Sequence, residues 1–279
     1  MPFCATCGQP LTKTATFCSE CGSPASSSSS PAGGGAAAAG LDALTASSTR
    51  SAGAVAYLLT IITGLYFLLS ERYRSDRFVR FHALQAILFF LAASALWVAY
   101  WVGSSLLRMV SFGFSFPVTY LASFILALAL IAYWLFLIYK AYQGETYKIP
   151  RLGDFAESIA QSGELSPNVA GALTYSLGFI TGIVFLLNDR YKRDRFVRFH
   201  AYQSIFASIA YIIIVVILSA VMGAMFLSGL GAFWNVFVLA FLTFRAAVCV
   251  GWFYLMWEAY LGKRVAIPGI DGLAAKQAV

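Results

Sequence analysis

Charged residues are scarce in this chain of 279 residues: Asp, Glu, Lys and Arg together make up 11%, against about a quarter in an average soluble domain. Apolar residues make up 60%, and the mean hydropathy is +0.76. This shortage of charge excludes a disordered chain and an ordinary cytosolic enzyme, and five cysteines are too few for a disulfide scaffold of this length. The composition predicts an integral membrane protein.

Catalytic patterns are also missing. The chain has two histidines, and it contains no Ser/His/Asp set, no His-Glu metal pattern and no phosphate-binding loop. We therefore expect a protein that is not an enzyme. The net charge of +7 does not indicate nucleic acid, because nine of the 19 basic residues lie in two short clusters between apolar runs. Membrane lipids, anionic ones in particular, are the expected partners of these clusters, and no nucleic acid is expected. The clusters are Arg72, Arg74, Arg77 and Arg80, and Arg190, Lys192, Arg193, Arg195 and Arg198.

Four of the five cysteines lie together near the N-terminus in the pattern C-x2-C-x10-C-x2-C, at Cys4, Cys7, Cys18 and Cys21. Each pair can present two thiolates to one tetrahedral zinc ion. Four cysteine ligands leave no open coordination position, so the zinc is expected to be structural and to supply the folding energy of a small β module over residues 1–24. The pattern is similar to the zinc ribbon found at the N-terminus of many bacterial membrane proteins.

A stretch rich in Ser, Gly and Ala follows at residues 25–52 and predicts a flexible linker. The linker would tether the zinc ribbon to the membrane part, where the ribbon would recruit a cytosolic protein. No apolar signal segment precedes the cysteines, which favours an N-terminus in the cytoplasm and a multi-pass protein of the cytoplasmic (inner) membrane. Two disulfides in a secreted chain are the alternative.

The membrane part is a tandem repeat. Residues 71–82 (ERYRSDRFVRFH) and 189–200 (DRYKRDRFVRFH) are identical at nine of twelve positions, with an offset of 118. The same offset relates Gly64 to Gly182 and Gln85 to Gln203. The sequence therefore divides into repeat 1 (53–150), a polar junction (151–170), repeat 2 (171–268) and a C-terminal tail (269–279).

Each repeat contains three apolar runs, at 53–70, 82–103 and 117–139 in the first and at 171–188, 200–222 and 233–257 in the second. A helix needs about 20 apolar residues to cross the hydrocarbon of a bilayer. The runs predict an all-α polytopic membrane protein with about six transmembrane helices, arranged as two three-helix repeats. An odd number of spans makes the repeats inverted and places the basic clusters on opposite sides, against the positive-inside rule. Four spans per repeat would place both clusters on one side and are the alternative.

The repeated motif is the best candidate site of the membrane part. It comprises Asp76, Arg77, Arg80, His82 and Gln85 in repeat 1 and Asp194, Arg195, Arg198, His200 and Gln203 in repeat 2. The aspartate can cap a helix and pair with the arginine four residues later. The histidine and glutamine lie three residues apart on one helix face, where they should face protein or water and not lipid. A structural latch to a neighbouring helix is the favoured interpretation, and a proton-handling or substrate-contact role and metal ligation are the alternatives.

Arg245 lies in the middle of the last apolar run, and its counterpart in repeat 1 is Ala127. An arginine at mid-membrane depth is a functional candidate by default. The alternative is an arginine that pairs with a helix-end carbonyl or with a polar group inside the bundle.

The order of these elements, with F-V-R-F-H-A-x-Q before two apolar runs and A-Y-x-G-x-x-x-x-I-P after them, resembles the Tic-translocon small-subunit-like family. This family contains a chloroplast import component and uncharacterised bacterial relatives. The matching residues are Phe78 to His82, Gln85, Gly144 and Pro150, and Phe196 to His200, Gln203, Gly262 and Pro268. The resemblance implies a channel-related role in preprotein import and carries over no catalytic residues. The tandem repeat and the zinc ribbon depart from the family's usual single unit.

These observations predict an integral membrane scaffold or translocation-associated component with a structural zinc ribbon. A small-solute or ion transporter built from inverted repeats is the alternative. The candidate partners are membrane lipids, a cytosolic protein that binds the zinc ribbon, and a second copy of the chain in a homo-oligomer.

Overall fold

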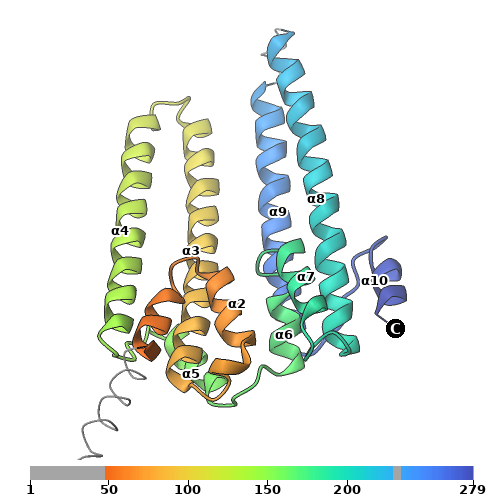
Figure 1. Cartoon of the computed structure of the whole chain (residues 1–279). Helices are drawn as coiled ribbons and strands as arrows, with labels where there is room; N and C mark the ends of the chain where they lie inside the picture. Colours follow the sequence, from red (N-terminus) through yellow and green to blue (C-terminus); the bar gives the residue numbers. More distant parts are fainter. Residues whose placement is uncertain (1–47, 229–233, 279) are drawn as a thin grey trace, which may run out of the picture. The chain divides into compact units, whose positions relative to one another are not determined.

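The computed structural model describes residues 48–228 and 234–278, and all regular structure in these residues is helical (Figure 1). The predicted zinc ribbon, with Cys4, Cys7, Cys18 and Cys21, and most of the predicted linker lie outside the described residues.

Four long helices form two helical hairpins, α3 (Arg77–Val110) with α4 (Phe116–Tyr142) and α8 (Arg195–Leu227) with α9 (Trp234–Tyr260). At 1.5 Å per residue, each is about 40 Å long or more, enough to cross about 30 Å of hydrocarbon. These four helices are the candidate membrane spans of the described chain. The prediction of six spans in two three-helix repeats is therefore wrong: each repeat has two.

The first apolar run of each repeat folds into a pair of short helices that we call the short hairpin. In repeat 1 the short hairpin comprises helical residues 48–55, a turn at 56–60 and α2 (Ile61–Leu69). In repeat 2 it comprises α6 (Pro167–Leu173), a turn at 174–178 and α7 (Phe179–Leu187). A nine-residue helix is about 14 Å long, less than half of the hydrocarbon thickness. The runs at 53–70 and 171–188 are therefore not spans.

Side-chain hydrogen bonds stabilise the turn inside each short hairpin. In repeat 1, Trp134 Nε1 on α4 donates to Tyr57 O at 2.9 Å, and Thr63 Oγ1 donates to Ala56 O at 2.8 Å. The same bonds recur in repeat 2, from Trp252 Nε1 to Tyr175 O at 2.6 Å and from Thr181 Oγ1 to Thr174 O at 2.5 Å. A carbonyl that a helix break leaves without its helical partner must find another donor in an apolar setting. The indole and hydroxyl groups supply that donor.

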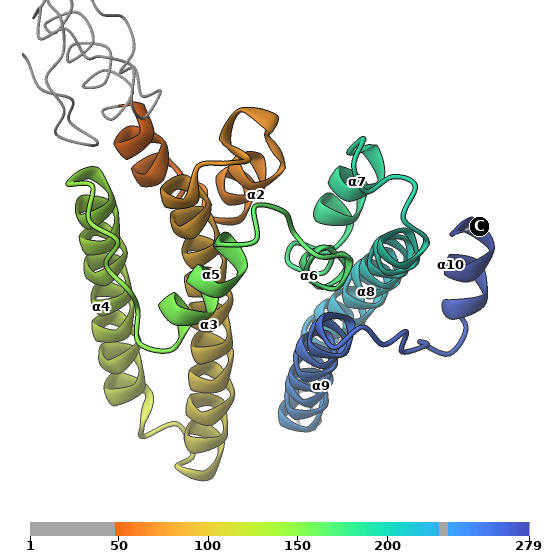
Figure 2. The same cartoon turned by 90° about the horizontal axis from the view of Figure 1, so that it is seen from below.

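The two repeats run in the same direction. Figures 1 and 2 show that α3 and α8 begin at one end of the molecule and that α4 and α9 return to it. Two spans per repeat bring the chain back to its starting side, so the predicted inverted orientation is also wrong. Of the 19 Lys and Arg residues, Lys13 lies outside the described residues, Arg108 lies near the far end of α3 and Arg245 lies within α9. The other sixteen lie at the end where α3 and α8 begin, which we call the basic end.

A further short helix follows each long hairpin. α5 (Leu152–Ala160) packs on α3, and α10 (Asp271–Gln277) packs on α8. Phe81 shares a buried cluster with Ala156 and Ala160, and their counterparts at the offset of 118, which are Phe199, Ala274 and Ala278, form an equivalent cluster. The repeated structural unit therefore includes one helix from the predicted junction and one from the predicted tail.

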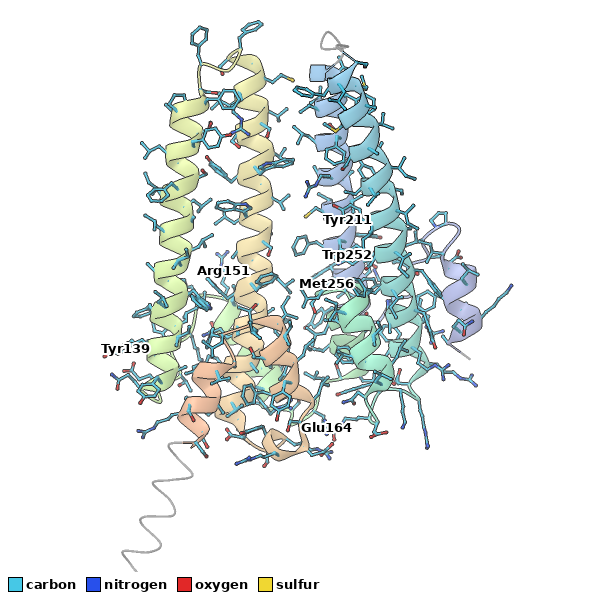
Figure 3. The ribbon with its side chains drawn as sticks, turned by 45° about the horizontal axis from the view of Figure 1, so that its top comes forward. Tyr139, Arg151, Glu164, Tyr211, Trp252 and Met256 are labelled. Atoms are coloured by element: carbon cyan, nitrogen blue, oxygen red, sulfur yellow. The ribbon has the colours of Figure 1, made fainter. Side chains whose placement is uncertain are left out.

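The buried core lies at the basic end. Its largest cluster joins both short hairpins, the first turns of α3 and α8, and α5. Two ion pairs lie there: Arg190 of repeat 2 pairs with Glu71 of repeat 1, and Arg74 of repeat 1 pairs with Glu164 in the junction. Farther along, the long helices expose apolar side chains, among them Leu121, Ile125 and Leu128 on α4. Nearer the basic end, Tyr139 also points outward from α4 (Figure 3) and is 56% exposed. Exposed apolar side chains on a long helix are what lipid contact requires.

The second helix of each short hairpin contacts the following long helix at a glycine. A Cβ atom on Gly64 would lie 2.9 Å from Ala83 O, and one on Gly182 would lie 2.8 Å from Ala201 O. A backbone oxygen cannot rotate away as a side chain can. Any larger residue at these two positions must therefore move one helix away from the other.

We expect Gly64→Ala and Gly182→Ala each to lower the free energy of unfolding by about 1–3 kcal/mol, because they over-pack this contact. Gly103→Ala is the matched control, since no atom lies within 4 Å of the added Cβ on this helical residue. It should be neutral or stabilise by up to about 1 kcal/mol through helix propensity. Unfolding in detergent, followed by circular dichroism, measures all three, and equal effects would contradict the close contact.

We also expect both basic clusters to lie in one compartment. Epitope tags inserted after Arg74 and after Lys192 should be accessible from the same side of the membrane, and a tag after Gly113, in the turn between α3 and α4, should be accessible from the other side. Proteolysis of intact cells and of inverted vesicles measures this. Opposite compartments for the first two tags would restore an odd number of spans per repeat.

Candidate functional site

Tyr57, His82 and Gln85 form a buried hydrogen-bonded cluster in repeat 1. His82 and Gln85 lie on the first turns of α3, and Tyr57 lies in the turn of the short hairpin. Tyr57 Oη is 3.2 Å from His82 Nδ1, and Gln85 Nε2 donates to Tyr57 Oη at 2.9 Å. Because Gln85 occupies a lone pair of the hydroxyl, the hydroxyl proton is free to bond His82 Nδ1. A neutral His82 then carries its proton on Nε2.

Gln85 also binds the extended segment that follows α4. Its Nε2 donates to Tyr147 O at 2.9 Å, and its Oε1 accepts from Ile149 N at 3.0 Å. The side-chain amide thus bonds this segment as a neighbouring strand would. One glutamine therefore joins α3, the short hairpin and the chain after α4, and we call the cluster of Tyr57, His82 and Gln85 the latch of repeat 1.

The latch of repeat 2 comprises Tyr175, His200 and Gln203. Tyr175 Oη is 3.0 Å from His200 Nδ1, and Gln203 Nε2 donates to Tyr175 Oη at 3.0 Å and to Val265 O at 3.0 Å. The copies differ at one atom: Gln203 Oε1 is buried without a partner among the described residues, whereas Gln85 Oε1 is paired. The latch is therefore one structural device that the chain uses twice.

Aromatic rings enclose each histidine. His82 lies 4.4 Å from the ring of Phe78 and 5.0 Å from that of Phe81, and the Phe196 and Phe199 rings take the same places around His200, at 4.4 Å and 5.2 Å. Both histidines are 1% exposed. Within the residues that the structure describes, no three His, Cys, Asp or Glu side chains lie close enough together to hold a metal ion.

Asp76 and Asp194 cap the two long helices that carry the latches. Asp76 Oδ1 accepts from Val79 N and Asp194 Oδ1 accepts from Val197 N, both at 3.0 Å. The ion pairs expected with the arginines four residues later do not form, since neither occurs among the ion pairs of the described chain. The carboxylates instead accept hydrogen bonds from the free backbone N–H groups of the first helical turn.

Arg80 and Arg198 point to the helices that follow each long hairpin. Arg80 Nε donates to Ala160 O at the end of α5 at 3.4 Å, and Arg198 Nη2 donates to Gln277 O at the end of α10 at 2.5 Å. The C-terminal carbonyls of a helix carry partial negative charge and attract a cation. Arg80 is fully buried, whereas Arg77 and Arg195, at the first residues of α3 and α8, are exposed.

Lys148 anchors the segment that Gln85 binds. Its Nζ donates to Glu157 Oε2 at 2.7 Å and to Asp154 Oδ1 at 3.2 Å, both on α5. The hydrogen bond to Glu157, followed by that to Asp154, raises the pKa of Lys148, so its charge persists throughout the neutral range. The extended segment is therefore fixed from α3 by the latch and from α5 by this ion pair.

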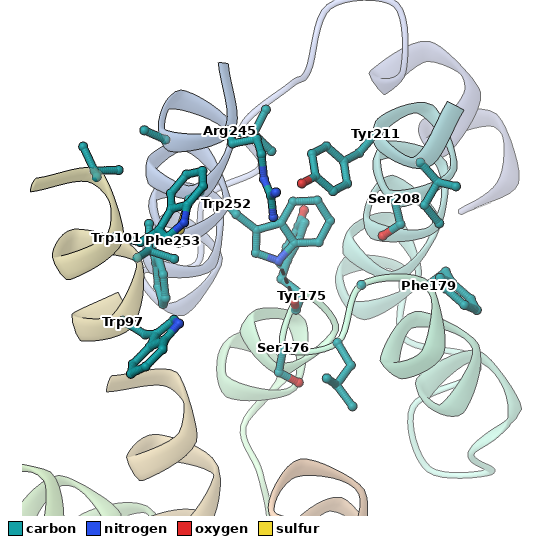
Figure 4. Close-up of a pocket in the computed structure, with 18 residues that line it drawn as sticks. Trp97, Trp101, Tyr175, Ser176, Phe179, Ser208, Tyr211, Arg245, Trp252 and Phe253 are labelled. Atoms are coloured by element: carbon teal, nitrogen blue, oxygen red, sulfur yellow. Dashed lines mark hydrogen bonds between the residues drawn. The ribbon is translucent and has the colours of Figure 1, made fainter. Parts of the chain in front are cut away.

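Arg245 lies apart from both latches, on the middle of α9. Its guanidinium lies 5.4 Å from the ring of Trp101 on α3 and 5.8 Å from that of Phe241. It borders a cavity of about 580 Å³ between α3 of repeat 1 and repeat 2 (Figure 4). The structure thus brings together the latch residues of each repeat and leaves Arg245 in a separate place.

Sequence reasoning missed the tyrosine of each latch and the tryptophan that holds each turn. Their signal was present, because Tyr57 and Tyr175, like Trp134 and Trp252, are separated by the offset of 118. Comparing every polar aromatic residue at that offset would have found both pairs.

Comparisons with known proteins cover the two parts of the chain. Residues 43–156 match a family described as a magnetosome magnetite crystal formation protein family. Residues 3–25, which include Cys4, Cys7, Cys18 and Cys21, match a zinc-ribbon domain. No solved structure matches the chain.

Three relatives are archaeal proteins named UPF0132 membrane proteins. One from Methanocaldococcus jannaschii is 37% identical over 109 residues, which are 39% of this chain and 86% of the relative. A second from the same organism is 39% identical over 112 residues, 38% of this chain and 65% of the relative. One from Archaeoglobus fulgidus is 38% identical over 108 residues, 38% of this chain and 89% of the relative.

The first and third of these relatives are each about the length of one repeat, since 109 or 108 aligned residues cover most of them. The protein is therefore a multi-pass membrane protein with an N-terminal zinc-ribbon domain, and its membrane part repeats a unit of about the length of these two relatives. At 37% identity over 86% of the first relative, the chain belongs to the UPF0132 membrane protein family.

Proposed function

We propose that this protein is a membrane scaffold, not an enzyme, which holds its basic end at the cytoplasmic membrane surface and recruits a cytosolic protein through a structural zinc ribbon. The observation that carries the proposal is that the latch residues of the membrane part form structural hydrogen bonds. The latch side chains bond one another and the backbone of adjoining segments, and they are buried in both repeats. Groups bound in this way position segments of chain, which is the work of a scaffold.

The distribution of basic residues supports the orientation. Sixteen Lys and Arg residues lie at the basic end, and Arg108 lies at the other. Cytoplasmic loops carry the excess of Lys and Arg in membrane proteins. Residues 48–55 also lie at the basic end, so the zinc ribbon before them belongs on the cytoplasmic side.

Anionic lipids are the partners that the basic end favours. Arg77 and Arg195 are exposed at the first residues of α3 and α8, where the spans meet the headgroups. Each basic side chain near an anionic surface contributes about 1 kcal/mol of attraction. These contacts would fix the depth of both repeats in the bilayer.

The inverted-repeat transporter loses its basis because the repeats are parallel (Figure 1). A scaffold remains compatible with the channel-related import role that the Tic-like resemblance implies, and with the crystal formation named in the description of the matched family. In either role, the recruited partner would carry out the specific chemistry, and the membrane helices would hold it at the membrane.

The latch predicts a stability effect without a catalytic one. Tyr57→Phe removes the hydroxyl between His82 Nδ1 and Gln85 Nε2 and leaves a buried acceptor unpaired, which should lower the free energy of unfolding by about 1–3 kcal/mol. Tyr66→Phe on α2 is the control, because Tyr66 is 64% exposed, and it should change that free energy by less than about 0.5 kcal/mol. Equilibrium unfolding in detergent measures both. Unchanged stability in Tyr57→Phe would contradict the latch.

Recruitment through the zinc ribbon predicts a partner that depends on zinc. The doubly substituted chain Cys4→Ser, Cys7→Ser removes two of the four ligands and should lose the captured cytosolic protein, because zinc supplies the folding energy of so small a module. Cys249→Ser, on α9, is the matched control and should retain it. Affinity capture of the full chain, with mass spectrometry of captured proteins, makes the comparison. The same captured proteins in both variants would contradict recruitment by the ribbon.

A further inference from the structure

Arg245 lies near the middle of a membrane span. It follows the first residue of α9 by eleven positions and precedes the last by fifteen. At 1.5 Å per residue these separations are about 17 Å and 22 Å, so the residue lies deep within a hydrocarbon layer about 30 Å thick. A charged side chain at this depth is costly, and it requires a partner that offsets the cost.

The described residues supply no acidic partner. The acidic residue of the four spans is Glu258, thirteen positions along α9, which pairs with Lys263 at 2.9 Å. Arg245 takes part in no ion pair and no hydrogen bond with the described residues. The rings of Trp101 and Phe241 attract the guanidinium, but they leave its N–H donors without acceptors.

A cavity lies beside Arg245 and is bordered by both repeats. Its volume is about 580 Å³, within the range of about 300–1,000 Å³ that small-molecule sites occupy. Figure 4 shows Arg245 and Tyr211 extending into the space that Trp252 borders. Trp97 and Trp101 border it from repeat 1. The walls are therefore largely apolar, with several aromatic rings and one cation among them.

Three polar groups of this cavity lie where the two repeats differ, whereas the lining residue Tyr175 matches Tyr57 of repeat 1. At the offset of 118, the counterparts of Arg245, Tyr211 and Ser208 are Ala127, Ala93 and Phe90. Trp252, which holds the turn of its short hairpin, instead has the matching Trp134. The tyrosine and tryptophan that maintain the fold are thus the same in both repeats, and the arginine, the second tyrosine and the serine of the cavity occur in repeat 2 alone.

We propose that this cavity binds a single-chain amphiphile whose anionic head lies against Arg245 and whose aliphatic tail lies along the aromatic walls. The guanidinium would donate charge-assisted hydrogen bonds to a carboxylate or phosphate head. A small inorganic anion fits less well, because largely apolar walls cannot replace its hydration. A tail, in contrast, gains from burial against Trp97, Trp101 and Phe253. This inference does not rest on the scaffold proposal.

Tryptophan fluorescence tests the proposal directly, because Trp97, Trp101 and Trp252 border the cavity. The probe is dibromostearate, whose bromine atoms quench nearby tryptophans, titrated into the full chain in detergent micelles. Dibromostearyl alcohol is the matched uncharged probe. We expect saturable quenching by the acid, at least tenfold weaker binding of the alcohol, and at least a tenfold loss of acid binding in Arg245→Gln.

Arg108→Gln is the control variant. Arg108 lies toward the far end of α3, has its own partners in Ser105 and Thr119, and does not border the cavity. It should bind the acid as the unchanged protein does. Equal binding of acid and alcohol, unchanged binding in Arg245→Gln, or displacement of the acid by inorganic phosphate would each overturn the proposal. The comparison of acid with alcohol needs no variant, so it decides the matter even if Arg245→Gln fails to fold.

Discussion

The fold depends on a hydrogen bond from an indole to a carbonyl, from Trp134 to Tyr57 and again from Trp252 to Tyr175. It supplies a donor where the helix breaks, and without such donors an apolar backbone would stay helical to satisfy itself. The break turns a potential third span into a short hairpin. The number of spans per repeat then becomes even, the repeats become parallel, and both basic clusters reach one end. A local backbone constraint thus sets the topology of the whole membrane part.

The latches hold together the chain segments that meet at the basic end. Each glutamine bonds the tyrosine of the short hairpin and the backbone after the second span, so two segments far apart in sequence are fixed to one helix. Arg80 and Arg198 add the helices that follow, through the carbonyls at their ends. Among the described residues, the outer parts of the spans have comparable polar contacts around Arg108 alone. Rigidity is therefore concentrated at the end that carries the charge.

Much of the fold and of the latches could be predicted from the sequence, and the wrong number of spans has one cause. The repeat, the four long helices and the grouping of His with Gln all follow from the offset of 118 and from apolar length. The runs at 53–70 and 171–188 have the length and composition of spans, and neither property reveals a break that a distant tryptophan stabilises. The positions of the basic clusters did indicate an even number of spans per repeat. Inverted repeats conflicted with the positive-inside rule, and two spans per repeat remove the conflict. The zinc site rests on the cysteine spacing and on the zinc-ribbon match.

Duplication within one chain also allows a cavity between the repeats that a single repeat cannot form alone. Two archaeal relatives, of which the chain covers 86% and 89%, are about one repeat long. In this protein the cavity beside Arg245 takes Trp97 and Trp101 from repeat 1 and its polar wall from repeat 2. A protein with one repeat can form such a cavity only by pairing two identical copies, and it would then need the same residues to serve as both walls. A tandem chain is free of that restriction. Trp101 can remain on one side while arginine replaces alanine on the other, because the two positions now belong to different parts of one sequence.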